Sequence, residues 1–250
     1  LFLQTDSPLT TEGKDLLVEE FGQDYQTFFS ILEVISGEKS VSNQKIAKTV
    51  GINLNNVSTY LSRLERRYSL IKRETPFLAP TSKKGLYKIK DKFLKVWFSV
   101  VFPNFSLIES HQKEVMMRLF KERFQNIKGV AFEDLVGEIA SFNYKEFPYQ
   151  KWGKYWAKSM EVDLLGFDPQ KKEMLLGECK LRVSGNPKTL ITELQRKKAV
   201  LQEVYTGNKV SVALFVASPV KKDAIKEFAK EDIKVYDAKA LDDLIDSGAP

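Results

Sequence analysis

The chain has 250 residues, 43% of them hydrophobic, and a formal net charge of +6 at pH 7. This length allows one large domain or two small ones, and the basic balance is compatible with a nucleic-acid partner. With one cysteine and one histidine, we expect neither an internal disulfide nor a zinc site made of Cys and His alone. The sequence shows no signal peptide and no apolar run of roughly 18 residues, so we expect no membrane span and a cytoplasmic protein.

Residues 1–90 are predicted to form a winged helix-turn-helix domain. Apolar residues recur with a helical period in residues 24–37, and Gly37 is a suitable stop. Ser42 can cap a short helix that ends in a tight turn at Gly51, and Asn55 or Asn56 can cap the next helix. Helix, short turn and helix, followed by two strand-like runs around a basic loop, are typical of a winged helix.

The outward side of the second helix is predicted to be its contact surface. Short polar side chains can approach base edges, whereas Arg and Lys neutralise phosphates. The same module also serves in other proteins for docking to protein partners, and both interpretations stay open. The predicted DNA-contact residues are Asn55, Ser58, Thr59, Ser62, Arg63, Arg66 and Arg67 on the helix, and Lys83 and Lys84 in the wing.

A helical connector is predicted over residues 91–125, followed by a mixed unit over residues 126–250. The order of elements in this unit is helix, strands, helix, strand, helix, strand, helix, which indicates an α/β or α+β fold. The predicted elements that matter for function are the helices at 130–142 and 186–205 and the strands at 161–167, 173–182 and 210–218.

Charged residues lie inside two of these predicted strands. The intervening sequence DPQK favours a type I turn, which would pair Phe167 with Lys172 and make Asp163 the diagonal neighbour of Glu178. Strand side chains alternate, so Glu178 and Lys180 share a face while the intervening cysteine points the other way. The turn therefore predicts that two carboxylates and an ammonium group converge.

Two interpretations fit such a cluster. Hard carboxylate oxygens suit Mg²⁺, which is usually held by one or two carboxylates together with water and substrate phosphate. The lysine would then orient or deprotonate a water, or stabilise negative charge on phosphorus. Alternatively, the residues form a plain salt-bridge cluster on a solvated face.

The pattern of Asp163 followed by Glu178-Cys179-Lys180 resembles the PD-(D/E)XK nuclease superfamily, although Val162 replaces the usual proline. The resemblance implies an overall α+β architecture in which the winged helix precedes a restriction-endonuclease-like α/β domain. It also implies Mg²⁺ or Mn²⁺ as cofactor, Asp163 and Glu178 as metal ligands, and Lys180 as the water-activating or charge-stabilising group.

In this superfamily an acid from the preceding helix often joins the metal site. Glu133 is the best match for that ligand, and Asp134 and Glu138 are poorer ones. Glu161 is a further acid beside the motif. Gln195 and Arg196, on the following helix, are weaker candidates for phosphate or water contacts.

Most of residues 25–182 also resembles the C-terminal half of archaeal P-loop ATPases of the AAA/STAND type. The resemblance rests on IAKTVGINLNNVSTYLSRLERRYSLIKRETP, LYKIKDKFLKVWFSVVFPN, VAFEDLV and EVDLLGF…LLGECK. No GxxxxGK[ST] motif occurs, so we expect no ATP site here, and an ATPase domain missing from this chain is the expected partner besides DNA. The resemblance implies a DNA-binding protein with a metal-dependent endodeoxyribonuclease-like domain, or a non-catalytic DNA-binding or docking module of an ATPase.

Overall fold

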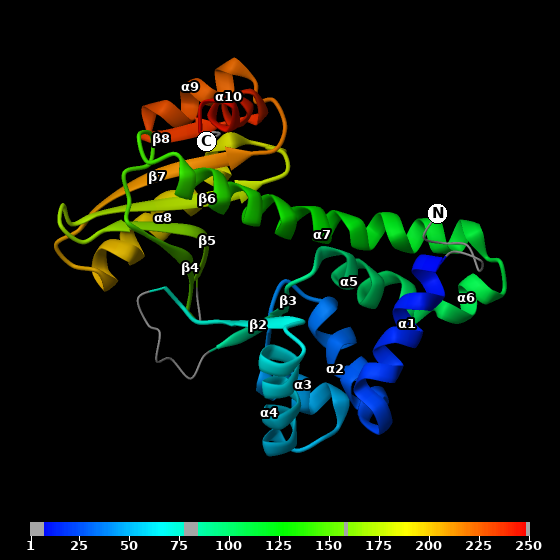
Figure 1. Cartoon of the computed structure of the whole chain (residues 1–250). Coiled ribbons are helices and arrows are strands. Elements are labelled where there is room, and N and C mark those ends of the chain that lie inside the picture. Colours follow the sequence, from blue (N-terminus) through cyan, green and yellow to red (C-terminus); the bar gives the residue numbers. More distant parts are fainter. Residues whose placement is uncertain (1–7, 78–84, 158–159, 249–250) are drawn as a thin grey trace. The chain divides into compact units, whose positions relative to one another are not determined.

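The computed structural model describes residues 8–77, 85–157 and 160–248, with side chains from residue 14 onward. The chain divides into an N-terminal unit, residues 1–75 and 81–127, and a C-terminal unit, residues 76–80 and 128–250. Figure 1 shows the elements of both units. Within the described ranges, no helix is long and apolar enough to cross a membrane.

The N-terminal unit is mainly helical, with a small antiparallel sheet of strand order β1-β3-β2. A π-helical turn, Arg63–Arg67, prolongs α4. Its helices are α1 (Pro8–Phe21), α2 (Tyr25–Ser36), α3 (Asn43–Val50), α4 (Leu54–Ser62), α5 (Lys92–Val96) and α6 (Phe105–Glu109), and its strands are β1 (Val41–Ser42), β2 (Ile71–Glu74) and β3 (Leu86–Ile89). The arrangement confirms the predicted winged helix.

The helix ends in this unit follow from local hydrogen bonds. The Ser42 side chain accepts the backbone N–H of Lys45, and Gly51 ends α3 in the left-handed conformation at φ 78°, as predicted. The cap of α4 differs from the prediction. Asn53, rather than Asn55 or Asn56, accepts the N–H of Asn56 at 2.8 Å, because the turn after Gly51 is short and α4 already begins at Leu54.

The segment predicted as a connector contributes to the core of the N-terminal unit. The buried side chains Trp97, Phe98, Val100 and Val101 pack in one cluster with those of α2. Beyond this segment, α7 (Lys113–Phe142) is one helix of 30 residues, where the sequence predicted two. No proline interrupts residues 113–142, and the glycines there weaken a helix by only about 1 kcal/mol each.

The C-terminal unit is built on a five-stranded mixed sheet of order β4-β5-β6-β7-β8. The β4–β5 and β5–β6 pairs are antiparallel, whereas the β6–β7 and β7–β8 pairs are parallel. The strands are β4 (Lys151–Ala157), β5 (Met160–Asp168), β6 (Glu173–Lys180), β7 (Lys209–Val216) and β8 (Ile233–Tyr236), and the helices that follow β6, β7 and β8 are α8 (Pro187–Val204), α9 (Lys222–Lys230) and α10 (Ala238–Gly248).

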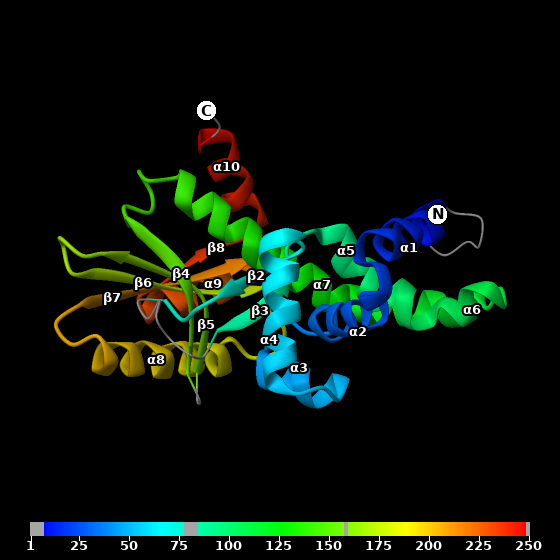
Figure 2. The same cartoon turned by 60° about the horizontal axis from the view of Figure 1, so that its bottom comes forward.

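Helices cover both faces of this sheet, as Figure 2 shows. On one face, Leu194 of α8 and Phe228 of α9 pack against alternate residues of β6 and β7. On the other face, Val136 of α7 and Leu241 of α10 pack against the intervening residues. The result is a three-layer α/β/α arrangement, in which the continuous apolar run of β7 is buried on both sides, as the sequence indicated.

The hairpin between β5 and β6 differs from the predicted register by two residues. Phe167 pairs with Met174 rather than with Lys172. Asp168 stays in β5, where its Oδ1 accepts two backbone N–H groups of the turn at 2.9 and 3.1 Å, and Lys172 ends the loop at a φ of 55°. Because the shift is even, it does not by itself move any side chain to the other face.

A β-bulge in β5 has a larger effect on the site. Leu165 pairs with Gly153 and Val162 with Tyr155, so that two residues of β5, Asp163 and Leu164, lie opposite one residue of β4. A bulge bends the strand and redirects the side chains at its position. It lies where the β5–β6 ladder ends, since the last pair recorded on that side is Leu164 with Gly177.

Candidate functional site

Glu178 is the most enclosed acid of the site. Its side chain is 4% exposed, and each of its two oxygens is bonded to a different lysine. Oε1 accepts from Lys180 Nζ at 2.6 Å, and Oε2 accepts from Lys197 Nζ at 2.7 Å. Lys197 projects from α8 and also lies 3.3 Å from Glu193 Oε1. Glu178 and Lys180 therefore share the α8 side of the sheet, as alternation along β6 predicts.

Asp163 reaches β6 from the bulge. It is 9% exposed, and its Oδ2 accepts the backbone N–H of Cys179 at 3.0 Å. Strand N–H groups point along the sheet toward the neighbouring strand, so this carboxylate lies near the plane of the sheet, where the β5–β6 ladder ends. The prediction that Asp163 is a diagonal neighbour of Glu178 on one face is thus corrected by the bulge.

Glu133, on α7, is paired with a lysine of β4. Lys154 Nζ lies 2.8 Å from Glu133 Oε2 and 3.8 Å from Asp134 Oδ1. The side chains of Glu133 and Lys154 are 11% and 19% exposed. Lys154 is also the residue opposite the bulge at Asp163. Glu138 is exposed on α7.

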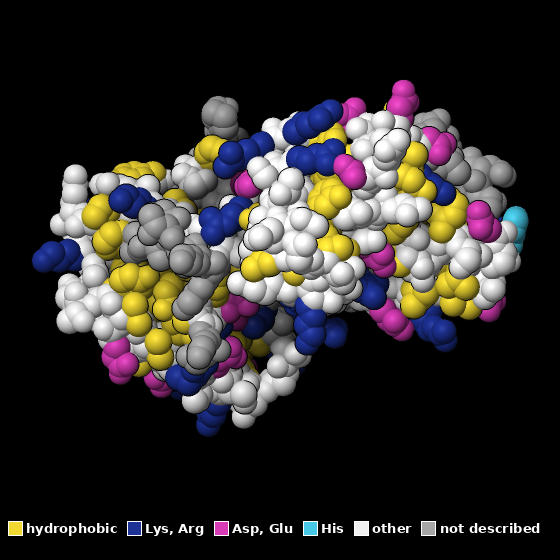
Figure 3. All heavy atoms as spheres, turned by 90° about the horizontal axis from the view of Figure 1, so that it is seen from below, with side chains coloured by type: hydrophobic (Ala, Val, Ile, Leu, Met, Phe, Trp, Pro, Cys, Tyr) yellow, Lys and Arg dark blue, Asp and Glu magenta, His cyan; other side chains and the backbone are white. Residues whose placement is uncertain are grey.

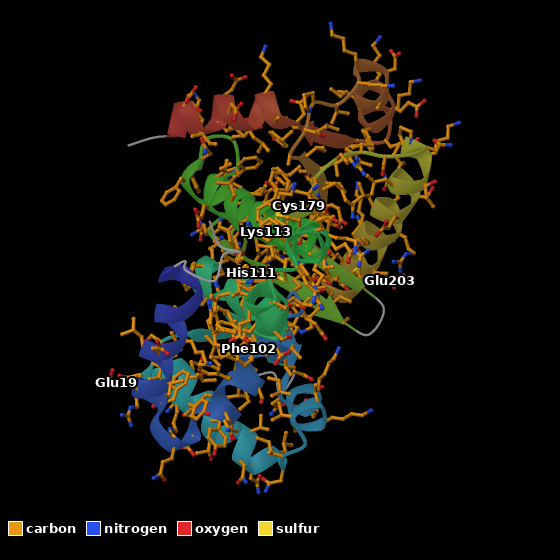
Figure 4. The ribbon with its side chains drawn as sticks, turned by 90° about the vertical axis from the view of Figure 1, so that its right-hand side faces the viewer. Glu19, Phe102, His111, Lys113, Cys179 and Glu203 are labelled. Atoms are coloured by element: carbon orange, nitrogen blue, oxygen red, sulfur yellow. The ribbon has the colours of Figure 1, made fainter. Side chains whose placement is uncertain are left out.

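The three predicted acids all contribute to the electrostatic environment of Cys179, near the end of β6. Burial raises the pKa of the Cys179 thiol well above its usual range, and the charges of Asp163, Glu133 and Glu178 raise it further. Cys179 is therefore an inert, protonated core residue, and Figure 4 shows it deep among packed side chains.

The charge state of Lys180 bears on its possible chemistry. Burial acts to lower its pKa, but the hydrogen bond to Glu178 and the charges of Glu178, Asp163 and Glu193 outweigh burial, so the pKa is raised. Lys180 is thus an ammonium group at neutral pH. This favours charge stabilisation over proton abstraction, the two roles that the sequence left open.

The donor set is chemically suited to a hard divalent cation, since Asp163 and Glu178 both offer carboxylate oxygens. Among the residues that the structure describes, however, no three His, Cys, Asp or Glu side chains are grouped so that they could hold a metal ion. Two of the acids are instead paired with ammonium groups, Glu133 with Lys154, and Glu178 with Lys180 and Lys197.

Lys197 and Lys154 were missed by the sequence reasoning. A signal for Lys197 exists, because it lies three residues after Leu194 and four before Leu201, on the apolar face of α8. Lys154 gave no comparable signal, because its role depends on the pairing of β4 with β5. Of the weaker candidates, Gln195 donates to the Glu231 carbonyl oxygen at 2.7 Å. Arg196 and Glu161 are exposed.

The predicted DNA-contact surface of α4 is largely available. The residues that are exposed there are Asn55, Ser58, Thr59, Ser62, Arg66 and Arg67. The hydroxyl groups of Ser58 and Thr59 donate to backbone carbonyl oxygens one turn earlier. In the view of Figure 3, lysine and arginine side chains are interspersed with acidic and apolar ones.

Arg63 differs from the other predicted contacts. Its guanidinium lies 2.6 Å from Asp24 Oδ2 and stacks 4.7 Å from the centre of the Phe28 ring. The hydrogen bond from Arg63 lowers the pKa of Asp24. Arg63 thus joins the end of α4 to the segment before α2, while 32% of its side chain remains exposed. Lys83 and Lys84 lie outside the described residues.

Two protein families match parts of the chain. Residues 29–67 match a winged helix-turn-helix DNA-binding family. Residues 97–199 match DUF234, described as archaeal and bacterial proteins of unknown function. The second segment contains Glu133, Asp163, Glu178, Lys180 and Lys197.

One curated relative and two solved structures are similar to the chain. The uncharacterized protein MJECL04 of Methanocaldococcus jannaschii is 29% identical over 206 residues, which are 79% of this chain and 46% of that protein. Can2 from Sulfobacillus thermosulfidooxidans, solved with cyclic tetra-adenylate, is 14% identical over 96% of this chain and 56% of its own, with a TM-score of 0.35. VC1899 from Vibrio cholerae is 13% identical over 97% of this chain and 56% of its own, with a TM-score of 0.33.

TM-scores this low do not establish a shared fold with the two solved structures. The chain spans about half the length of the curated relative and of both structures. The family matches, together with the three-stranded sheet of the wing, support an architecture in which a winged-helix DNA-binding module precedes a DUF234 segment.

Proposed function

We propose that the chain binds duplex DNA through α4 and the wing, and that its C-terminal unit hydrolyses phosphodiester bonds with Mg²⁺ or Mn²⁺ as a PD-(D/E)XK nuclease-like domain. The observation that carries the proposal is that Lys180 bonds Glu178 while Asp163 accepts the backbone N–H of Cys179, the residue between them, at the end of the β5–β6 ladder. The order of elements supports it too: α7, three antiparallel strands, then α8 and the parallel strand β7.

Each residue of the motif has a distinct task in this proposal. Asp163 and Glu178 would hold the cation, and Glu133 would orient water or complete the ligand set from α7. A bound divalent cation would polarise a phosphoryl oxygen and lower the pKa of a water molecule. The Lys180 ammonium, with 37% of its side chain exposed, can reach a phosphate and stabilise the negative charge that develops on it.

The alternative is a non-catalytic DNA-binding or regulatory docking module of a P-loop ATPase. The observation in its favour is that Glu133 and Glu178 already have ammonium partners, so that neither needs a metal ion for its charge to be balanced. Under this alternative the C-terminal unit would contribute to binding or assembly, and the ATPase domain would supply the chemistry of the whole protein.

Metal-dependent nicking of supercoiled DNA tests the first proposal. We expect the purified chain to nick DNA with Mn²⁺ or Mg²⁺ and to stop when EDTA is added. Asp163→Asn removes a charged ligand and should reduce nicking to background, while binding of duplex DNA is retained. Lys226→Met, which alters an ammonium group with a 75% exposed side chain on α9, is the matched control and should be fully active.

Lys180 distinguishes the two possible roles of the lysine. Lys180→Met should lower the nicking rate by roughly a hundredfold or more, the range for loss of one charge-stabilising group. Lys180→Arg keeps a permanent cation and should retain part of the activity, whereas a general base would be lost with either change. Absence of metal-dependent cleavage on duplex, single-stranded and branched DNA, also in the presence of the ATPase domain and ATP, would leave the non-catalytic alternative.

A further inference from the structure

The buried lysine of α8 is the group of the site that the motif does not explain. Lys197 is 7% exposed and lies on the face of α8 that otherwise carries Ile191, Leu194 and Leu201. An ammonium group on an apolar helix face is costly unless it is paired and hydrogen-bonded. Its position therefore requires a specific partner, and the partner is an acid of the candidate site.

Lys197 and Lys180 hold Glu178 in different ways. Lys197 Nζ bonds Oε2 at 2.7 Å with 8% of its side chain exposed, whereas Lys180 Nζ bonds Oε1 at 2.6 Å with 37% exposed. The buried ammonium cannot leave toward solvent, but the other can turn toward a ligand at the surface. One oxygen of Glu178 thus has a fixed counter-ion and the other an exchangeable one.

We propose that Lys197 is a positioning residue of the candidate site, a built-in cation that holds Glu178 through its Oε2 and competes with a divalent cation for this carboxylate. The inference rests on the proposed function only for the assignment of Glu178 as a metal ligand. The contact itself, between the middle of α8 and the end of β6, is independent of that assignment.

A second acid makes an exchange possible. Glu193 Oε1 lies 3.3 Å from Lys197 Nζ, one turn earlier on α8, and its side chain is 44% exposed. If Glu178 were to hold a divalent cation, Lys197 could keep a partner by shifting fully to Glu193. Until it shifts, its positive charge repels the incoming cation, so the ammonium group lowers the affinity of the site for metal.

The test is metal binding to the complete chain without DNA. We expect Lys197→Met to bind Mn²⁺ at least tenfold more tightly than the parent in calorimetry, because one competing charge is gone and the aliphatic stem is kept. Without metal, the variant should melt at a lower temperature, since Glu178 keeps only one partner. Saturating Mn²⁺ should raise its Tm by roughly 5 °C more than it raises the Tm of the parent.

Two matched variants separate this role from simple packing. Lys197→Arg keeps the charge and should bind Mn²⁺ as weakly as the parent. Lys198→Met removes the neighbouring ammonium of α8, which lies 3.9 Å from the exposed Asp232, and should change neither the affinity for Mn²⁺ nor the response of the Tm. Adding Glu178→Gln to Lys197→Met should abolish the gain in affinity, because the liberated carboxylate is then absent.

The outcomes are distinguishable from those of the nicking assay. If Lys197→Met gains no affinity for Mn²⁺ and Mn²⁺ does not restore its Tm, the inference is wrong and the lysine serves the fold alone. Should Lys197→Met unfold at all metal concentrations, Lys197→Gln gives the same comparison with a shorter, polar side chain. If the parent chain binds Mn²⁺ but never cleaves DNA, the proposed function is wrong, and the inference about Lys197 is not affected.

Discussion

The two surfaces to which function is assigned differ in how their charges are used. On α4, Arg66 and Arg67 are exposed, and their neighbours are short polar side chains. In the C-terminal unit, Glu178 is buried and each oxygen is bonded to a lysine. The side chains of the first surface can contact a ligand without rearrangement. In the second, Glu178 must give up a bond to a lysine before that oxygen can bind a ligand. Side chains of the first kind can be changed at little cost in stability, and those of the second kind cannot.

Removing the charge of Glu178 should give the largest effect. Glu178→Gln leaves the buried Lys197 ammonium without its main counter-ion, and breaking a buried pair in this way costs about 3 kcal/mol of unfolding free energy. Urea unfolding of the complete chain measures it. Glu193→Gln changes a partner of the same lysine whose side chain is 44% exposed, and should cost less than about 1 kcal/mol. Equal losses for both variants would remove the contrast between buried and exposed partners.

The exposed arginines of α4 should matter for DNA and not for stability. Changing Arg66 and Arg67 together to Ala should make the slope of log K against log salt concentration less negative by about 2, because each phosphate contact contributes about −0.9. Lys222 and Lys226 of α9, changed to Ala, remove the same charge from a different surface and should leave the slope unchanged. An unchanged slope for the arginine pair would favour protein docking as the use of this helix.

The cap of α4 offers a smaller test within one helix. Asn53→Ala removes the oxygen that accepts the Asn56 N–H and should lower the unfolding free energy by about 1 kcal/mol. Asn55→Ala, two residues later, should lower it by less than about 0.5 kcal/mol but weaken binding to duplex DNA. Thermal unfolding measures the loss of stability, and a titration with duplex DNA measures the loss of binding. If Asn55→Ala lowered the stability more than Asn53→Ala does, Asn55 would be the cap.

The smallest expected effect is on the pH dependence of the N-terminal unit. The hydrogen bond from Arg63 lowers the pKa of Asp24 in the folded chain. The stability that this bond adds is therefore fully present above the ordinary carboxyl pKa of about 4, and it is lost as the pH falls through the lower pKa of the folded chain. Asp24→Asn should therefore melt at a slightly lower Tm than the parent at pH 6, and the difference should shrink toward pH 3. A difference that grows in acid would contradict the assignment.

Local patterns were sufficient for the parts of the fold that local chemistry controls. Ser42 caps α3 and Gly51 ends it, as their side-chain chemistry predicted. The turn between the two strands was predicted, but the loop is residues 169–172 rather than 168–171 and the register was wrong by two residues, because the Asp168 side chain holds the turn from within β5. The alternation of Glu178 and Lys180 along β6 was predictable for the same reason, since it depends on one strand alone.

The remainder of the site depends on contacts between distant segments. Lys154 and Glu133 are 21 residues apart in the chain. They meet only because β4 pairs with β5 and α7 packs on that sheet. Lys197 meets Glu178 across 19 residues for a similar reason. Neither pair has a periodicity or a turn signal that connects its members. The sequence thus predicted the acids and Lys180, but not Lys154 and Lys197.

The bulge at Asp163 and Leu164 has a consequence for how relatives of this chain are aligned. Before it, Met160 and Val162 point into the core beneath α8; after it, Leu165 does so, and the parity of the strand has changed. A relative that lacks the bulge would have one residue fewer at this place. A gap opened anywhere else in the strand would align its core residues with the wrong neighbours and move its acid away from Asp163, so the position of that single gap decides whether the motif is recognised.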